Sequence, residues 1–328
     1  MKDEDLTLDS MRARHRELES YVVHTPVCNW EGRKLDALLP PGATVTAKLE
    51  IMQKTGTFKA RGALSNVMAL TAEERAPGVT GASAGNHAIA IAFAARTAGV
   101  HAKVVMMSSA NPARIEAAKA YGAEIIMAVD GMAAFAKVDA IAKVEGRAVI
   151  PPFEGYNTVL GTAGVGLELM ADAPNIEAVI VAVGGGGLAA GVAAAVKAIN
   201  PECLVYGVEP EGADSMSRSF AAGRPVTLEH IDTIADSLAP PMALPYSFGV
   251  CQANMEEIVT VSDAALCTSM ALMFHDRALA VEPAAAASTA ALIGPLRERL
   301  AGKKVGIIVC GSNIDFDYFS ELIGRGMQ

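Results

Sequence analysis

Short, continuous apolar segments recur along the chain and alternate with helix-length segments that are rich in small residues. Examples of the apolar segments are AKVVMM at 102–107, AVIVAV at 178–183 and VGIIVC at 305–310. A strand of a parallel sheet that is buried on both faces has such a run. Strands that alternate with helices form parallel sheets covered by helices. The sequence therefore predicts an α/β fold with mostly parallel sheets.

The expected elements follow from this alternation and from the turn residues between the segments. We expect strands over 43–49, 79–82, 102–107, 124–129, 148–150, 178–183, 204–209 and 305–310. We expect helices over 8–20, 57–70, 86–98, 111–121, 131–145, 160–171, 188–199, 215–222, 262–277 and 283–300. The segment 235–249 holds three prolines and is predicted to be a loop.

The length of the chain and the order of its elements indicate two domains. A chain of 328 residues has room for about two domains of ordinary size. Several strand–helix units lie between residues 79 and 150, and the others lie on both sides of that block. We therefore predict a small inserted domain over 78–150 and a large domain from 1–77 plus 151–328. The active site is expected in the crevice between them.

Charge and composition exclude several classes of partner. The chain has 27 basic and 36 acidic side chains, a net charge of −9 that repels nucleic-acid phosphates. The N-terminal segment is charged and unlike a secretion signal, and no apolar run reaches the roughly 18 residues of a membrane span. The five cysteines are an odd number with no CxxC pair, which predicts reduced thiols in the cytoplasm.

Four consecutive glycines at 184–187 join a predicted buried strand to a predicted helix. Backbone N–H groups in such a turn, together with the positive end of the helix, bind phosphate without any basic side chain. The glycines and Ala189 also match the dinucleotide fingerprint loosely, and Glu209 has the position of a ribose-binding acid. An NAD(P)-dependent oxidoreductase is therefore an alternative reading of this loop.

Two further segments carry candidate chemistry. Lys59 follows Phe58 at the start of a predicted helix. A lysine amine near a helix N-terminus and an aromatic ring is disfavoured as a cation, so its pKa falls and it can bond an aldehyde covalently. The segment SAGNH at 83–87 follows another strand, and its polar side chains and N–H groups can receive a carboxylate. Such residues also cap ordinary helices.

The order and spacing of these motifs resemble those of fold-type II pyridoxal-phosphate enzymes, in the branch of serine/threonine dehydratases and serine racemases. The resemblance covers nearly the whole chain. It rests on TGTFKARGA (55–63), SAGNHA (83–88), PPFEGYNTVLGTAGVGLE (151–168), GGGGL (184–188), VEPEGA (208–213), VEPAAAAS (281–288) and CGSNID (310–315). It implies two three-layer α/β domains of the tryptophan synthase β-like fold, with the active site between them.

The resemblance also implies roles for the matching residues. Lys59 would hold pyridoxal 5'-phosphate and act as the catalytic base on the α-proton of the substrate. The implied cofactor-binding residues are Phe58, Lys59, Asn86, Gly184, Gly185, Gly186, Gly187, Leu188 and Cys310. The implied substrate-binding residues are Ser83, Ala84, Gly85, Asn86 and His87, which form a loop for the substrate carboxylate.

The implied activity is that of a dehydratase, or ammonia-lyase, which converts a β-hydroxy L-amino acid to a 2-oxo acid and ammonia by α,β-elimination. L-threonine or L-serine is the favoured substrate, and the resemblance implies a homodimer. A 3-hydroxyaspartate dehydratase and a serine racemase of the same fold are alternatives.

Some positions depart from the pattern of the branch. Cys310 stands where serine is usual, and we expect a neutral thiol there because burial in an apolar strand raises its pKa. A neutral partner leaves the pyridine nitrogen unprotonated and favours elimination. Ala84 stands where racemases carry a second serine, and alanine has no proton to transfer, so racemisation is disfavoured. Ser237 replaces a usual glycine, which leaves the identity of the substrate open.

Some members of the branch hold a divalent cation. The matching positions here are Glu209, the carbonyl group of Ala213, and Ser215 in place of a second carboxylate. Hard cations such as Mg²⁺ or Ca²⁺ need about six oxygen ligands, of which waters can supply several. A cation at these residues is therefore a further expectation.

Overall fold

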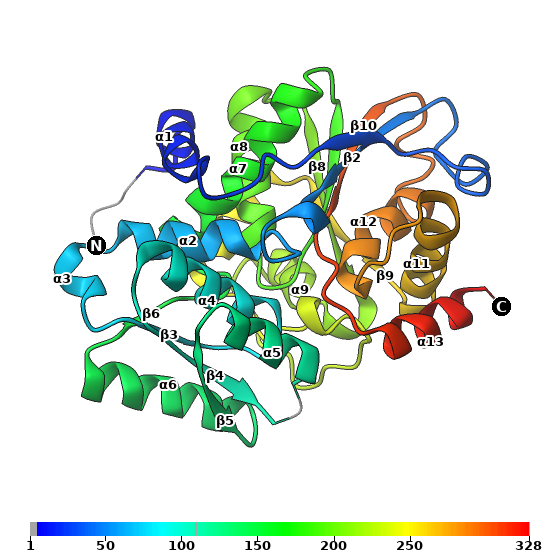
Figure 1. Ribbon diagram of the computed structural model, residues 1–328. Helices are drawn as coiled ribbons and strands as arrows, with labels where there is room; N and C mark the ends of the chain where they lie inside the picture. The colour runs from blue at the N-terminus through cyan, green and yellow to red at the C-terminus, as the bar shows by residue number, and fades with distance from the viewer. Residues whose placement is uncertain (1–4, 109, 328) are drawn as a thin grey trace.

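The computed structural model describes residues 5–108 and 110–327, whose strands form two separate sheets (Figure 1). The larger sheet has six strands in the order β1-β2-β10-β7-β8-β9. Its first strand is antiparallel to the second, and all other neighbours are parallel. These strands are β1 (Val27–Asn29), β2 (Thr44–Leu49), β7 (Ala178–Ala182), β8 (Leu204–Pro210), β9 (Glu257–Val261) and β10 (Lys304–Val309).

The smaller sheet has four parallel strands in the order β5-β4-β3-β6. They are β3 (Val79–Ala82), β4 (Ala102–Met107), β5 (Glu124–Ala128) and β6 (Ala148–Val149). Together with α4 (Asn86–Ala98), α5 (Pro112–Ala120) and α6 (Gly131–Glu145) they form what we call the small lobe. The predicted α/β fold with mostly parallel sheets is confirmed.

The rest of the described chain forms the large lobe. Its helices include α1 (Leu8–Leu18), α2 (Lys59–Ala69), α3 (Ala72–Arg75), α7 (Tyr156–Asp172), α8 (Gly187–Ile199), α9 (Ser215–Ala222), α10 (Pro245–Asn254), α11 (Asp263–Arg277), α12 (Pro283–Ile293) and α13 (Phe316–Gly326). The two separate sheets are compatible with a division into two domains. The exact bounds of the small domain, 78–150, stay a prediction. Residues 1–4 and 328 of the predicted large domain lie outside the described residues.

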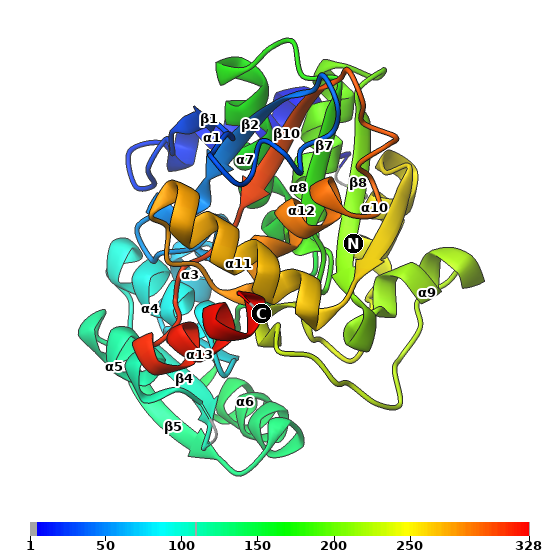
Figure 2. The same cartoon turned by 90° about the vertical axis from the view of Figure 1, so that its right-hand side faces the viewer.

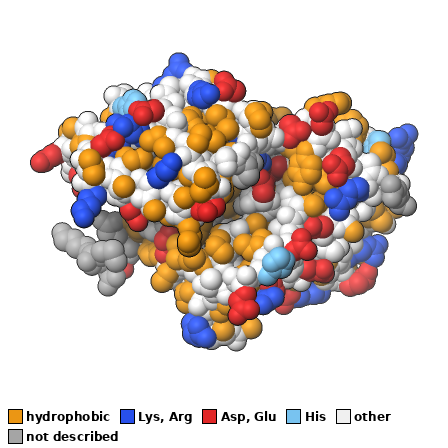
Figure 3. Space-filling view, turned by 90° about the horizontal axis from the view of Figure 1, so that it is seen from below, with side chains coloured by type: hydrophobic (Ala, Val, Ile, Leu, Met, Phe, Trp, Pro, Cys, Tyr) orange, Lys and Arg blue, Asp and Glu red, His pale blue; other side chains and the backbone are white. Residues whose placement is uncertain are grey.

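Helices cover both faces of the large sheet. Figure 2 shows α12 on one face, with α11 and then α13 outside it, while α7 and α8 lie on the other side. Seen from below, the surface is hollowed near its middle, and hydrophobic side chains lie along the hollow (Figure 3). Within the described part of the chain, no helix is long and apolar enough to cross a membrane.

Close contacts between α2, α7 and α8 explain the many small residues in these helices. A methyl group on Gly161 in α7 would lie 2.5 Å from the carbonyl oxygen of Arg61 in α2. A methyl group on Gly191 in α8 would lie 2.2 Å from the hydroxyl oxygen of Thr162 in α7. Both distances are below van der Waals contact, so only glycine permits this packing. The packing sets the relative positions of α2 and α8, whose N-terminal ends carry Lys59 and the glycine loop.

Some predicted boundaries are wrong for identifiable reasons. The predicted helix over 283–300 ends at Ile293, because Pro295 has no N–H group and restricts the backbone of the residue before it. The predicted loop over 235–249 holds the short 3-10 helix η3 (Asp236–Leu238) and the start of α10. Pro245 occupies the first turn of α10, where a missing N–H group is tolerated. The elements β1, α3, β9 and α13 were not predicted.

Candidate active site

One cavity lies where strands of the large sheet end and the first turn of α4 from the small lobe approaches them. It is lined by Phe58, Lys59, Asn86, Phe153, Ala182, Gly184, Gly185, Gly186, Gly187, Leu188, Ser237, Leu238, Glu282, Ala284 and Cys310. Every residue predicted to bind the cofactor is among them. Ligands of open α/β folds bind at such carboxyl ends of parallel strands.

Lys59 is the first residue of α2, and its side chain lines this cavity. The side-chain nitrogen donates a hydrogen bond to the carbonyl oxygen of Pro152 at 2.6 Å. It lies 5.2 Å from the centre of the Phe58 ring. Burial lowers the pKa of the amine to about 8, although Cys310 and Glu282 act in the opposite direction. The amine is therefore neutral more readily than that of an ordinary lysine, as a nucleophile or base must be.

The glycine loop connects β7 to α8 and has no room for side chains. A methyl group on Gly185 would lie 2.2 Å from the ring of Phe153, and one on Gly187 would lie 2.6 Å from its carbonyl oxygen. Gly186 has a φ of +88°, which favours glycine. The backbone N–H groups of this loop and the positive end of α8 thus line the cavity and suit a phosphate group.

Cys310 directly follows β10 and closes another side of the cavity. Burial raises the pKa of its thiol, and the carboxylate of Glu282 raises it further. The thiol is therefore neutral at physiological pH, as the sequence predicts. It can take part in a weak hydrogen bond but adds no negative charge to the cavity.

The predicted carboxylate loop runs from Ser83 into the first turn of α4. The hydroxyl oxygen of Ser83 accepts a hydrogen bond from Gly85 N–H at 3.0 Å, and Ala84 packs at the edge of the apolar core of the small lobe. The ring of His87 is hydrogen-bonded to the carbonyl oxygen of Ile150 at 2.9 Å. Burial, assisted by the charge of Lys59, lowers the pKa of His87 to about 3. His87 is thus neutral and offers no positive charge to a carboxylate.

Asn86 is hydrogen-bonded to residues that sequence reasoning did not single out. Its amide nitrogen donates to both carboxylate oxygens of Glu282 at 2.9 Å and to Ser237 at 3.3 Å. Its amide oxygen accepts a hydrogen bond from Asn313 at 2.8 Å. Glu282 lies within the VEPAAAAS motif, which was a usable signal. Arg114, which pairs with Glu282, lies outside all of these motifs. The sequence around it therefore gave no indication that it contributes to the site.

Comparisons with known proteins agree with this geometry. A family model described as "Pyridoxal-phosphate dependent enzyme" matches residues 21–311. The chain belongs to this family. It is 49% identical over 316 residues to phenylserine dehydratase from Ralstonia pickettii, covering 96% of this chain and 95% of that protein. It is 33% identical over 325 residues to L-threonine ammonia-lyase from Thermotoga maritima, covering 98% and 79%.

Solved structures of pyridoxal-phosphate enzymes share the fold. The structure of maize serine racemase superposes with a TM-score of 0.91 at 33% identity and covers 98% of both chains. The resemblance to the fold-type II enzymes of the dehydratase and racemase branch is therefore confirmed. The chain is an enzyme of this family.

The residues of the cavity fit pyridoxal phosphate. The amine of Lys59 suits the aldehyde group, and the glycine loop would hold the phosphate in a backbone cradle that any side chain would fill. Phe58 and Cys310 lie on further sides of the same cavity, where they would contact the ring. When bound, pyridoxal phosphate supplies an electron sink for the pair of electrons left on the substrate after loss of the α-proton.

Glu209 lies at the N-terminal end of α9, where its carboxylate accepts backbone hydrogen bonds. Its two carboxylate oxygens accept hydrogen bonds from the N–H groups of Met216 at 2.9 Å and Ser217 at 2.7 Å, in the first turn of α9. Burial raises its pKa to about 8. The family assignment removes the NAD(P)-dependent alternative. The described residues include no cluster of three or more His, Cys, Asp or Glu side chains suited to a metal ion.

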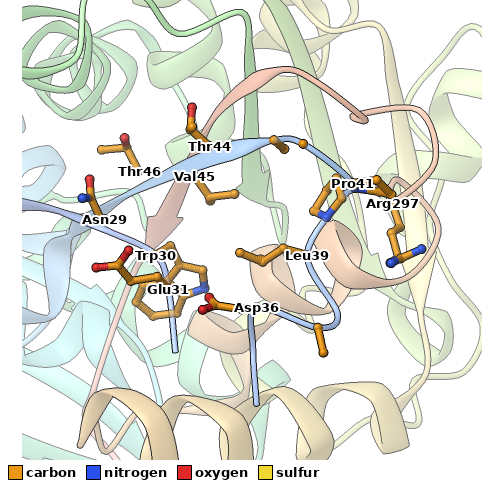
Figure 4. A pocket seen from close by; sticks show the side chains of 14 residues that line it. Asn29, Trp30, Glu31, Asp36, Leu39, Pro41, Thr44, Val45, Thr46 and Arg297 are labelled. Carbon is orange, nitrogen blue, oxygen red and sulfur yellow. The ribbon is translucent and has the colours of Figure 1, made fainter. Parts of the chain in front are cut away.

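A larger cavity of about 540 Å³ lies elsewhere, beside β2 (Figure 4). Its lining includes Trp30, Asp36 and Arg297 but none of the predicted site residues. The indole nitrogen of Trp30 is shielded from solvent and has no hydrogen-bond partner among the described residues. Size alone therefore does not identify the active site, whereas the chemistry of Lys59 and the glycine loop does.

Proposed function

We propose that the enzyme is an ammonia-lyase that converts a β-hydroxy L-amino acid to a 2-oxo acid and ammonium. The observation that carries this proposal is the partly buried, readily neutral amine of Lys59, which shares a cavity with the glycine loop, in a chain 49% identical to a dehydratase. Water leaves in the elimination and is taken up again when ammonium is released. The net reaction therefore consumes only the amino acid.

In this proposal the residues of the chain have separate tasks. Lys59 would hold the cofactor through its aldehyde group, and the neutral amine of Lys59 would take the proton from the substrate Cα. The N–H groups of the glycine loop hold the cofactor phosphate. The loop 83–87 orients the substrate carboxylate through backbone N–H groups and the Ser83 hydroxyl, because His87 is neutral.

Two residues favour elimination over competing reactions. The neutral thiol of Cys310 would give the cofactor ring no anionic partner, so less negative charge would build up on the ring during the reaction. Ala84 cannot deliver a proton to the substrate carbanion. Both features disfavour racemisation and transamination, so the β-hydroxyl group leaves instead.

We further propose that the β-substituent of the preferred substrate is aromatic, as in phenylserine. The motifs alone favour L-threonine or L-serine. The side chains of Val129, Met132 and Phe135 are 80%, 85% and 61% exposed, and they lie just after β5 or in the first turns of α6. Large apolar side chains gathered on a surface indicate a binding site.

These apolar side chains follow the same sheet edge as the carboxylate loop. β3 ends at Ala82, which pairs with Val105 of β4, and β5 ends at Ala128, which pairs with Met107, so β5 ends two residues beyond β3. Neighbouring strands lie about 4.8 Å apart and rise about 3.3 Å per residue, which puts the end of β5 roughly 12 Å from the loop after β3. A phenyl group on the substrate can cover much of that distance.

The same region does not favour the second carboxylate of 3-hydroxyaspartate. The segment 128–136 reads AVDGMAAFA and has no basic residue. Arg114, the cation at the cavity mouth, is already paired with Asp236 at 2.5 Å and Glu282 at 3.4 Å. A second substrate carboxylate would have to displace these partners.

A parallel assay of 2-oxo acid release tests both proposals. We expect kcat/KM for L-threo-phenylserine to exceed the values for L-threonine, L-serine and L-threo-3-hydroxyaspartate by at least about tenfold. The double variant Met132→Ser/Phe135→Ser should lose this preference. Val144→Ser, at an exposed apolar position in the last turn of α6, is the matched control and should keep it. A preference for L-threonine contradicts the aromatic substrate, and no 2-oxo acid from any of the four contradicts the ammonia-lyase.

We also propose a homodimer in the cytoplasm. The five cysteines are all free. Phe274 and Phe316 on neighbouring helices α11 and α13 are 41% and 80% exposed, which supports a covered face there. Light scattering during gel filtration should give twice the chain mass of 33.9 kDa. The monomer mass would contradict the dimer.

A divalent cation at Glu209, Ala213 and Ser215 is the last part of the proposal. Its support is the buried hydroxyl of Ser215, which has no hydrogen-bond partner within the described chain. Treatment with EDTA is expected to lower the thermal unfolding midpoint, and Mg²⁺ or Ca²⁺ should restore it. A midpoint that is unchanged by both treatments contradicts a cation at this loop.

A further inference from the structure

Glu282 is a buried carboxylate that the proposed reaction does not use. It is only 2% exposed and immediately precedes α12. Its oxygens accept hydrogen bonds from Asn86 at 2.9 Å and from Ser237 at 3.3 Å. The guanidinium of Arg114 lies 3.4 Å away. The carboxylate lines both the cofactor cavity and the neighbouring cavity at its mouth.

The contacts around Glu282 join the two lobes. Asn86 and Arg114 belong to α4 and α5 of the small lobe, whereas Glu282 belongs to the large lobe. Arg114 also reaches Asp236 and donates a hydrogen bond to the carbonyl oxygen of Asn313 at 3.0 Å. The position of α4, and of the carboxylate loop before it, therefore depends on these contacts.

The carboxylate of Glu282 lies at a position where burial disfavours its charge. Burial raises its pKa to about 7, and Arg114 only partly offsets the effect. The other charged or titratable groups that face it are Asp236 on η3, Lys59 on α2 and Cys310 after β10. A neutral side chain of the same size would avoid the desolvation penalty. A costly buried charge beside a site indicates a functional role.

We propose that Glu282 is a positioning residue that holds the amide of Asn86 at the cofactor cavity, with Arg114 linking this arrangement to the small lobe. The inference rests on the proposed use of the cavity for pyridoxal phosphate. Glutamine at 282 has the same shape, but it has one acceptor oxygen in place of two. Its NH₂ group would face the NH₂ group of Asn86 or the cation of Arg114.

The test is the affinity of the apoprotein for pyridoxal phosphate, measured by absorbance titration without substrate. Glu282→Gln is expected to weaken binding by about tenfold or more, as loss of a charge-assisted hydrogen bond would. The thermal midpoint of the apoprotein should stay unchanged or rise, because a buried charge is removed. Glu168→Gln, at a buried carboxylate of the large lobe away from the cavity, is the matched control. It should lower the midpoint and keep the affinity.

A double-mutant cycle tests whether Glu282 acts through Asn86. If it does, Asn86→Ala/Glu282→Gln should bind the cofactor no more weakly than Asn86→Ala alone. Asn86→Ser provides the same cycle if the alanine variant does not fold. Additive losses, or an affinity for Glu282→Gln within twofold of wild type, would overturn the proposal. Because no substrate is present, failure of the ammonia-lyase proposal would leave this result intact.

Discussion

Two clusters of charged residues differ in how completely their members are buried and paired. In the large lobe, Arg61 contacts Glu50 at 2.8 Å and Glu168 at 2.7 Å, and Lys48 contacts Glu168 at 2.7 Å. All four side chains are buried and lie in one lobe. We call this the Arg61 cluster.

The second cluster, which we call the Arg114 cluster, consists of Arg114, Asp236, Glu282 and Asn86. It has one cation for two carboxylates, and its contacts cross between the lobes. The difference indicates that the Arg61 cluster stabilises a fixed core, whereas the Arg114 cluster holds two lobes together at a site that must admit substrate. Predictions that separate the two clusters follow, from the largest effect to the smallest.

The largest difference in turnover should appear between variants of Lys59, near the Arg114 cluster, and of Lys48, in the Arg61 cluster. Lys59→Ala is expected to lower turnover by about a thousandfold or more, because it removes the proposed base and the proposed covalent link to the cofactor. Lys48→Ala should leave kcat within a few-fold but destabilise the fold, because it leaves Glu168 with one partner fewer. Assays of turnover and of cofactor labelling by borohydride check both variants. Wild-type turnover in Lys59→Ala would contradict the role assigned to this lysine.

The arginines should differ in their effect on folding. Arg61→Ala leaves two carboxylates buried without their main partner and should reduce the free energy of unfolding by about 3–5 kcal/mol. Arg114→Ala should cost clearly less, because Glu282 can take up a proton near neutral pH and Asp236 is exposed to solvent. Urea unfolding of both variants gives the comparison. Equal losses of unfolding free energy would mean that the Arg114 cluster stabilises the fold as much as the Arg61 cluster does.

The two clusters should also respond to pH with opposite sign. Burial alone would raise the pKa of Glu168, but Arg61 and Lys48 lower it below its ordinary value. Its contribution to stability is therefore present above that ordinary value and is lost in acid. The pKa of Glu282 is raised from 4.5 to about 7, so the folded state binds its proton more tightly and stability falls as pH rises through this range.

The free energy of unfolding, measured from about pH 4.5 to 7, checks this contrast. The free energy of unfolding of Glu282→Gln should rise relative to that of wild type as pH increases, by roughly 1–3 kcal/mol at the upper end of the range. Glu209, whose pKa is also raised, contributes equally to both proteins, so its effect cancels in the difference between the two free energies. Parallel curves for the two proteins would show that Glu282 has an ordinary pKa.

The smallest effect is expected at Cys310. Because its thiol is already neutral, Cys310→Ser replaces one neutral hydrogen-bonding group by another, and kcat should stay within about threefold of wild type. A loss of a hundredfold or more would indicate that the residue acts as a thiolate. The absorbance spectrum of the bound cofactor, which reports on its ring nitrogen, provides a second measurement.

The comparison of clusters also explains what the sequence could and could not predict. Lys59, the glycine loop and the segment 83–87 could be singled out because each belongs to a local motif at the start of a helix. Glu282 and Arg114 are 168 residues apart, and their contact depends on how the lobes pack. Neither hydrophobic periodicity nor turn chemistry contains that information.

The same reasoning applies to the elements of the fold. Strands with continuous apolar runs, such as β4, β7 and β10, were predicted within one or two residues of their observed bounds. β9 reads EIVTV, where Glu257 and Thr260 interrupt the apolar run and three positions are only partly buried, so it lacked the signal of a buried parallel strand. Roles of the individual site residues remain predictions until the variants above are measured.

The position of Trp30 gives the protein an internal reporter. It is the only tryptophan of the sequence and is buried in the large lobe, with Arg277 over its ring. Fluorescence emission will therefore shift when the large lobe unfolds but will be insensitive to an opening confined to the small lobe. Circular dichroism reports on the helices and strands of both lobes. Coincidence of the melting curves from fluorescence and circular dichroism would therefore show that the enzyme unfolds as a single cooperative unit.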